Sequence, residues 1–226
     1  MQQERRSFLT RGGAMLLGLV TLETIRSGRS EATTPDMQPA MLIDLNRCTG
    51  CHSCVIACKE QHHTPAGLFN TRIEVSEHGS YPIAWQHYRP ELCHQCQDAP
   101  CVTACDHGAT FALANGIVVT DWTLCTGDGA CVAVCPYQAR SLNREQGDRV
   151  EKCDFCIDLL AKGLSPACVE ACAPGARVFG SLTNPEGKFS LRFKQLKKEN
   201  SQVATHPTER VLFLAARKGE PENSRS

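Results

Sequence analysis

The stretch CTGCHSCVIAC, residues 48–58, sets the organisation of the chain. Its first three cysteines, Cys48, Cys51 and Cys54, are separated by two residues each, so one compact loop can direct three thiols to a single site. Cys58 follows after three more residues, about one turn of a helix, so its thiol points elsewhere. The stretch therefore predicts a loop that runs into a helix and supplies sulfur ligands to two different sites.

The chain contains 15 cysteines in 226 residues, and those outside the first stretch form three further groups. Each group ends in two cysteines separated by three residues, as the first group does. The groups are Cys93, Cys96, Cys101 and Cys105; Cys125, Cys131 and Cys135; and Cys153, Cys156, Cys168 and Cys172. This internal repetition predicts that the same unit, a cysteine-bearing loop that runs into a helix, occurs four times.

The third group has one cysteine fewer than the others. Residues 125–135 read CTGDGACVAVC and match residues 48–58 position for position, with Asp128 where the first group has Cys51. The self-comparison identifies Cys125 and Cys131 as members of the same kind of loop, although the gap between them alone means little. Asp128 is therefore a candidate ligand in the place of a thiolate.

The number and spacing of the cysteines favour iron–sulfur clusters. Clustered cysteines indicate disulfides, zinc or iron–sulfur sites, and an odd total fits a pure disulfide framework poorly. Tetrahedral zinc needs four ligands for each ion, and it does not require that three of them come from one cysteine group and the fourth from another. Iron–sulfur proteins do use three cysteines for one cluster and the next for another. A zinc-stapled or disulfide-stapled binding protein is the alternative from a different class.

Charge and motif content exclude several other functions. The chain has 24 basic and 24 acidic residues, so its formal net charge is zero and it has no excess of positive charge that would favour nucleic-acid binding. No Ser–His–Asp arrangement, paired-carboxylate motif or glycine-rich phosphate loop stands out. We therefore expect no active site of its own.

Residues 1–32 resemble a twin-arginine signal peptide. Residues 4–10 read ERRSFLT, and a short apolar run at residues 14–22 is too short to span a bilayer comfortably. The small residues before Ala32 predict cleavage after that position. A retained basic amphipathic anchor is the alternative. The twin-arginine route carries folded proteins, typically with cofactors already inserted, so we expect an exported, periplasmic protein.

Between the groups, the pattern predicts short elements. Residues 64–90 are polar and broken by glycine and proline, with one strand at 83–88, and Asn115-Gly116 between apolar runs indicates a tight hairpin. The other expected elements are strands at 41–45 and 211–214, helices at 55–62, 157–163 and 189–198, hairpins at 109–113/117–120 and 139–143/148–152, and a disordered tail from residue 218.

Taken together, these features resemble a known family, the iron–sulfur subunits of complex iron–sulfur molybdoenzymes. The pattern is most similar to the electron-transfer subunits of tetrathionate and polysulfide reductases, and it covers about residues 40–215. The resemblance is carried by the order and spacing of the four groups and by the motifs MLID at 41–44, RPELC at 89–93, GIVV at 116–119, CPYQAR at 135–140, KCDFC at 152–156 and PACVE at 166–170.

The resemblance implies an α+β fold of two bacterial-ferredoxin-like modules with short hairpins and helices and little regular structure. Groups one and four would form one module, and groups two and three the other. We therefore expect a signal peptide at 1–32, the paired 4Fe–4S domains at 33–180, and a C-terminal helix, strand and flexible tail at 181–226.

The resemblance also implies which cysteines hold each cluster, because the last cysteine of a group serves the cluster of its paired group. The implied ligand sets are Cys48, Cys51, Cys54 and Cys172 for the first cluster; Cys153, Cys156, Cys168 and Cys58 for the second; Cys93, Cys96, Cys101 and Cys135 for the third; and Cys125, Cys131, Cys105 and Asp128 for the fourth. The first three are expected to be [4Fe–4S] clusters.

Three alternatives are open for the fourth site. Asp128 is an oxygen ligand to a labile iron of a [4Fe–4S] cluster, or it lies beside a [3Fe–4S] cluster, or the site is a degenerate turn without a cluster. Carboxylate is a harder ligand than thiolate and holds such an iron less firmly. The first two alternatives predict about 15 to 16 irons per chain.

By resemblance, the chain is expected to be a non-catalytic electron-transfer subunit. It would relay electrons between a membrane-embedded, quinone-reactive subunit and a large molybdopterin catalytic subunit of the tetrathionate, polysulfide or thiosulfate reductase kind. The alternative within the same class is a ferredoxin-like electron carrier of a periplasmic nitrite- or sulfite-reduction complex.

Overall fold

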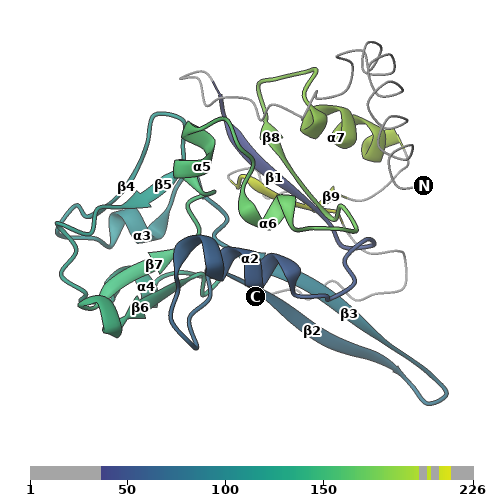
Figure 1. The fold of residues 1–226 in the computed structure, drawn as a ribbon, viewed down its shortest axis with the longest axis horizontal. Helices are drawn as coiled ribbons and strands as arrows, with labels where there is room; N and C mark the ends of the chain where they lie inside the picture. The colour runs from purple at the N-terminus through teal and green to yellow at the C-terminus, as the bar shows by residue number, and fades with distance from the viewer. Residues whose placement is uncertain (1–36, 199–202, 205–208, 215–226) are drawn as a thin grey trace, which may run out of the picture.

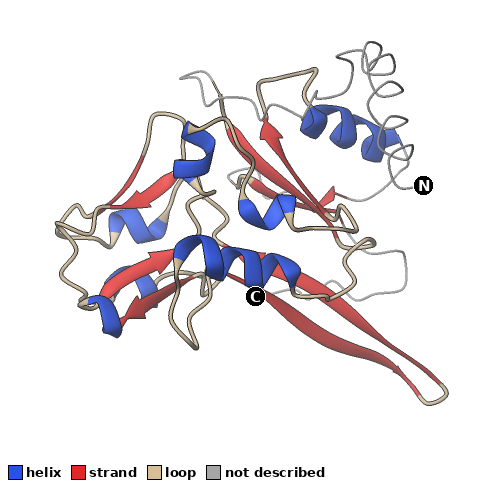
Figure 2. Cartoon of the chain, viewed as in Figure 1, coloured by secondary structure: helices blue, strands red, loops and turns tan. Residues whose placement is uncertain are grey.

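A computed structural model describes residues 37–198, 203–204 and 209–214. Short helices and small sheets alternate along the chain, which confirms the predicted α+β class (Figures 1 and 2). The predicted signal peptide, residues 1–32, and the predicted tail from residue 218 lie outside the described residues. In the described ranges no helix combines the length and apolar character that crossing a membrane requires.

One four-stranded sheet joins the two ends of the described chain. Its strands are ordered β8 (Arg177–Ser181), β1 (Pro39–Asp44), β10 (Val211–Leu214) and β9 (Val203–Ala204). Strand β1 pairs in parallel with β10 and antiparallel with β8. Because side chains alternate across a strand, Ala40 and Leu42 pack with helix α7 (Lys188–Lys198), whereas Met41 and Ile43 face a core that contains buried cysteines.

Four helices carry the ends of the cysteine groups. They are α2 (Ser53–His62), α3 (Pro100–Thr103), α4 (Ala130–Ala133) and α6 (Ala167–Glu170), and a cysteine is the second residue of each. Helix α2 packs against α6, and α3 packs against α4. Groups one and four therefore lie together, as do groups two and three.

The predicted hairpins around Asn115-Gly116 and Gly147 are present. Strand β4 (Thr110–Ala112) pairs with β5 (Val118–Thr120), and β6 (Arg140–Asn143) pairs with β7 (Arg149–Lys152). A short 3-10 helix, η1 (Arg144–Gln146), lies in the second turn. Helix α5 (Ile157–Ala161) follows β7, as the sequence predicted. These elements lie together with α3 and α4 at one side of the molecule (Figure 1).

A two-stranded arm projects from the body of the protein, formed by β2 (Thr71–Ser80) and β3 (Ile83–Leu92) (Figure 1). The sequence predicted residues 83–88 of β3, whereas β2 lies in the stretch described only as polar and broken by glycine and proline, so this strand was missed. Residues 75–77 and 79–80 of β2 are exposed and His78 is half-buried, and residues 76–80, SEHGS, have no apolar alternation of the kind that marks a half-buried strand. The base of the arm lies against the first cysteine loop, since a Cβ on Gly50 would collide with the Tyr88 ring.

Candidate metal centres

All 15 cysteines are free thiols, and all lie between residues 48 and 172, within the described part of the chain. Fourteen of them have other cysteines as electrostatic neighbours, and Cys54 of the first predicted set is also a neighbour of Cys58 and Cys168 of the second. Cys54 and Cys172 are electrostatic neighbours of Cys48; Cys153, Cys156, Cys168 and Cys58 are neighbours of one another; Cys93, Cys101 and Cys135 are neighbours of Cys96; and Cys105 and Cys125 are neighbours of Cys131.

Cys51 is the one thiol that these pairings do not include. It is exposed on the first loop, and its thiol donates a hydrogen bond to the Ser53 hydroxyl at 3.4 Å. The hydrogen bonds with Ser53 lower the pKa of Cys51. The loop therefore presents Cys51 at the surface, between two more sheltered cysteines of the same group.

The second set lies deepest in the protein. Cys153, Cys156, Cys168 and Cys58 are all buried, although Cys58 comes from the first group and the others come from the fourth. Burial, followed by the neighbouring Cys168 thiol, raises the pKa of Cys58 to about 12. Thiols packed in this way cannot all ionise without a nearby cation, whereas metal binding displaces their protons and uses the thiolates as ligands.

The third set surrounds a pocket that is lined by Cys93, Cys96, Cys101 and Cys135. Burial also raises the pKa of Cys96 to about 12. His94 lies in this pocket wall, but its ring nitrogens contact Glu209 at 2.8 Å and Glu91 at 3.4 Å, and its ring stacks on Tyr137. His94 thus supports the wall of the site through its own polar partners.

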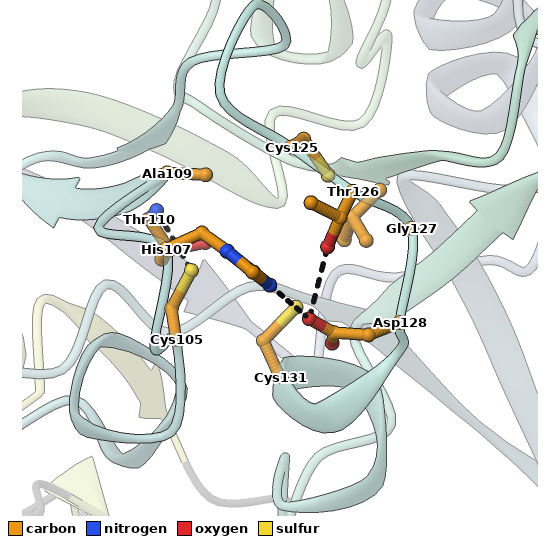
Figure 3. A pocket seen from close by; sticks show the side chains of 10 residues that line it. Cys105, His107, Ala109, Thr110, Cys125, Thr126, Gly127, Asp128 and Cys131 are labelled. Carbon is orange, nitrogen blue, oxygen red and sulfur yellow. Dashed lines mark hydrogen bonds and ion pairs between the residues drawn. The ribbon is translucent and has the colours of Figure 1, made fainter.

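The fourth set surrounds a second pocket, with Cys105, Cys125, Cys131 and Asp128 in its lining (Figure 3). Asp128 Oδ1 accepts a hydrogen bond from the Ala130 N–H at 2.8 Å, and Oδ2 accepts one from the Thr126 hydroxyl at 3.1 Å. His107 Nε2 lies 3.5 Å from Oδ2. The hydrogen bond from Ala130, followed by that from Thr126, lowers the pKa of Asp128, so the side chain is an ionised carboxylate at the pocket rim.

The structure also shows polar side chains near the thiols that sequence patterns did not predict. His62 Nε2 lies 3.1 Å from Cys156 Sγ, and both side chains gather with Asp154 within 4.8 Å. The guanidinium groups of Arg140 and Arg177 are buried, and three of their nitrogens have no hydrogen-bond partner among the described residues: Arg140 Nε, Arg140 Nη2 and Arg177 Nε. Buried donors without acceptors, placed beside soft sulfur ligands, fit a site completed by a sulfide-containing anion.

Comparisons with known proteins agree with this donor set. Residues 39–60 match the model of a 4Fe–4S binding domain, and residues 84–182 match that of a 4Fe–4S dicluster domain, so the matched segments contain all four cysteine groups. The chain is 38% identical to a subunit of the tetrathionate reductase of Salmonella typhimurium over 203 residues, which are 86% of this chain and 80% of that protein. The chain belongs to the family of ferredoxin-like iron–sulfur subunits.

Two further members of the family have names that describe similar roles. The thiosulfate reductase electron transfer subunit of Salmonella typhi is 40% identical over 152 residues, 66% of this chain and 79% of that protein. A subunit of the sulfite dehydrogenase of Allochromatium vinosum is 34% identical over 180 residues, 70% of this chain and 75% of that protein. This ferredoxin-like subunit therefore has 4Fe–4S domains and relatives that are named as subunits of reductase and dehydrogenase complexes. The comparisons support the interpretation as a reductase subunit and not the nitrite- or sulfite-reduction alternative.

Proposed function

We propose that the chain is the electron-transfer subunit of an exported, membrane-associated oxidoreductase complex. It relays electrons between a quinone-reactive membrane subunit and a molybdopterin catalytic subunit that acts on tetrathionate, polysulfide or thiosulfate. The observation that carries the proposal is the clustering of free thiols: seven cysteines and Asp128 line two pockets, and four further cysteines are buried beside one another. The names of the relatives, which are subunits of tetrathionate and thiosulfate reductases, support the choice of complex.

For the first three clusters we propose the ligand sets that the family resemblance implies, and for the fourth cluster we propose Cys105, Cys125 and Cys131 as ligands. When bound, the clusters would supply one-electron redox chemistry, and the chemistry at the substrate would belong to the partner. The residues of this chain hold the clusters, exclude water from the second set and keep adjacent sets close. We propose three [4Fe–4S] clusters and, at the fourth site, a [3Fe–4S] cluster beside Asp128.

The arrangement of the helices supports a linear order of the four sets. Helix α2 carries Cys54 of the first set and Cys58 of the second, which are four residues and so about 6 Å apart along the axis. In the same way, Cys101 at α3 belongs to the third set and Cys105 just after it to the fourth. Gln95, which is fully buried, donates a hydrogen bond from Nε2 to the Cys153 carbonyl at 2.7 Å and so joins the second and third sets.

Deleting the chain from the producing organism tests the proposed role. Membranes of the deletion strain should reduce tetrathionate, thiosulfate or polysulfide with a reduced viologen dye, which reaches the catalytic subunit directly. Reduction with a quinol analogue should fall to background, because no relay joins the membrane subunit to the catalytic one. A deletion strain that keeps full quinol-driven activity with all three acceptors would contradict the proposal.

The exported location is a proposal that is supported by the ERRSFLT motif at residues 4–10 and the short apolar run behind it. Residues 1–36 lie outside the described part of the structure. Cell fractionation of the unchanged chain beside the double variant Arg5→Lys, Arg6→Lys tests the location. The unchanged chain should be found in the periplasmic and membrane fractions and the variant in the cytoplasm, and an identical distribution of the two would count against the twin-arginine route.

A further inference from the structure

Two buried arginines occupy matching positions in the two halves of the protein. Arg140 is 5% exposed and Arg177 is 3% exposed. Each lies five residues after the last cysteine of its group, in the segments CPYQAR, residues 135–140, and CAPGAR, residues 172–177. Each is also the first residue of a strand, β6 for Arg140 and β8 for Arg177. The repeated placement indicates a shared role.

Arg177 lies between the first and second cysteine sets. Its Nη1 is 3.7 Å from Cys168 Sγ, and its strongest electrostatic partners are the thiols of Cys168, Cys54 and Cys153 rather than carboxylates. Cys54 belongs to the first set, whereas Cys168 and Cys153 belong to the second. Arg177 Nη2 donates a hydrogen bond to the Thr71 hydroxyl at 2.8 Å, which fixes the guanidinium in this position.

Arg140 lies in the same way between the third and fourth sets. Its guanidinium is an electrostatic neighbour of Cys101 in the third set and of Cys131 in the fourth. Its Nη1 donates a hydrogen bond to the Thr110 hydroxyl at 3.2 Å. Thr110 begins β4 as Thr71 begins β2, so each arginine is held by a threonine at the start of another strand.

The cost of burying these charges points to what balances them. An ionised guanidinium in a protein interior is strongly unfavourable unless an anion lies beside it. Neutral thiols do not supply that charge, whereas cysteine thiolates on a cluster do. The buried nitrogens without partners among the described residues, one on Arg177 and two on Arg140, are donors available to such an anion.

We propose that Arg177 and Arg140 are internal counter-ions, each shared by the two clusters of one module, and that they raise the reduction potentials of those clusters. The proposal rests on the proposed function, because it needs the clusters to be present. Each reduction takes one electron from the donor and adds one unit of negative charge, and no bond forms or breaks. A fixed positive charge stabilises the reduced cluster more than the oxidised one, so the potential rises.

Potentiometric titration of the full-length chain, assembled and purified without oxygen and followed by EPR, tests the proposal. Arg177→Met removes the charge and keeps an apolar side chain of similar reach. It should lower the potentials of the first and second clusters and leave those of the third and fourth unchanged. Arg140→Met is the matched control: it should lower the potentials of the third and fourth clusters and leave those of the first and second unchanged. Arg177→Lys keeps the charge and should restore potentials close to those of the unchanged protein. Single cysteine variants assign each signal to its cluster.

Two results would overturn the proposal. One is a fully loaded Arg177→Met protein whose four potentials all equal those of the unchanged protein. The other is a shift of equal size in all four clusters, which would exclude a local effect. If the methionine variant fails to assemble the first two clusters, the proposal predicts that Arg177→Lys restores their iron, and loss of the same iron in both variants would contradict it. Unchanged protein without clusters would instead refute the proposed function.

Discussion

Replacing Cys168 with alanine should remove about four irons from the chain, because the second cluster loses a ligand in a site that water does not reach. Cys168 is buried and has the buried thiols of Cys58 and Cys153 as neighbours. Alanine has no atom that can bind iron, and no solvent molecule can replace the thiolate as a ligand deep in the core. Iron analysis and EPR of the anaerobically prepared variant measure the loss.

The informative control is Cys58→Ala, since Cys58 belongs to another cysteine group 110 positions earlier in the chain. Cys58→Ala and Cys168→Ala should abolish the same EPR signal. Cys54→Ala, only four residues from Cys58, should abolish a different one. If Cys58→Ala and Cys168→Ala removed two different signals, the exchange of ligands between groups one and four would be wrong.

Replacing Asp128 with cysteine should convert the fourth site into a complete [4Fe–4S] site. The iron content should rise from about 15 to about 16 per chain, and the [3Fe–4S] signal of the air-oxidised protein should disappear. Both carboxylate oxygens of Asp128 already accept hydrogen bonds from their own loop, and the side chain is 47% exposed. An iron at this corner would meet a hard, solvated ligand and leave readily, whereas a thiolate would hold it.

Asp128→Ala is the matched control for this experiment. If the fourth site holds a [3Fe–4S] cluster, the alanine variant should keep the signal and the iron content of the unchanged protein. A different outcome would favour Asp128 as an iron ligand. In that case the unchanged protein would contain about 16 irons and show no [3Fe–4S] signal, and only the alanine variant would lose an iron. EPR of the three oxidised proteins side by side separates these cases.

Local sequence signals predicted most of the small elements. Strand β10, Val211–Leu214, has the predicted bounds, and the two hairpins agree within a residue or two, because tight turns and short apolar runs are encoded locally. The central sheet was not predicted as a unit. Strand β1 pairs in parallel with β10, about 170 residues further along the chain, and no local pattern specifies such a partner. Strand β8 was missed because its single short apolar segment lies between glycines.

The candidate site shows a similar division. Spacing identified three of the cysteine groups, and the comparison of residues 125–135 with residues 48–58 identified the third group and Asp128. The exchange of ligands between groups came from the family resemblance. The burial of Arg177 and the contact of His62 with Cys156 were not predicted, because a charged or titratable side chain is normally expected at the surface. Whether it is buried depends on the segments that close over it. The repeated Ala-Arg after the last cysteine of two groups was a signal in the sequence that could have identified both arginines.

The iron and acid-labile sulfide content of the chain, purified without oxygen, tests the central claim most directly. The account predicts about 15 iron and about 16 sulfide atoms for each chain, in a brown protein that bleaches when dithionite reduces it. A colourless protein that contains zinc in place of iron and releases no sulfide on acidification would contradict it.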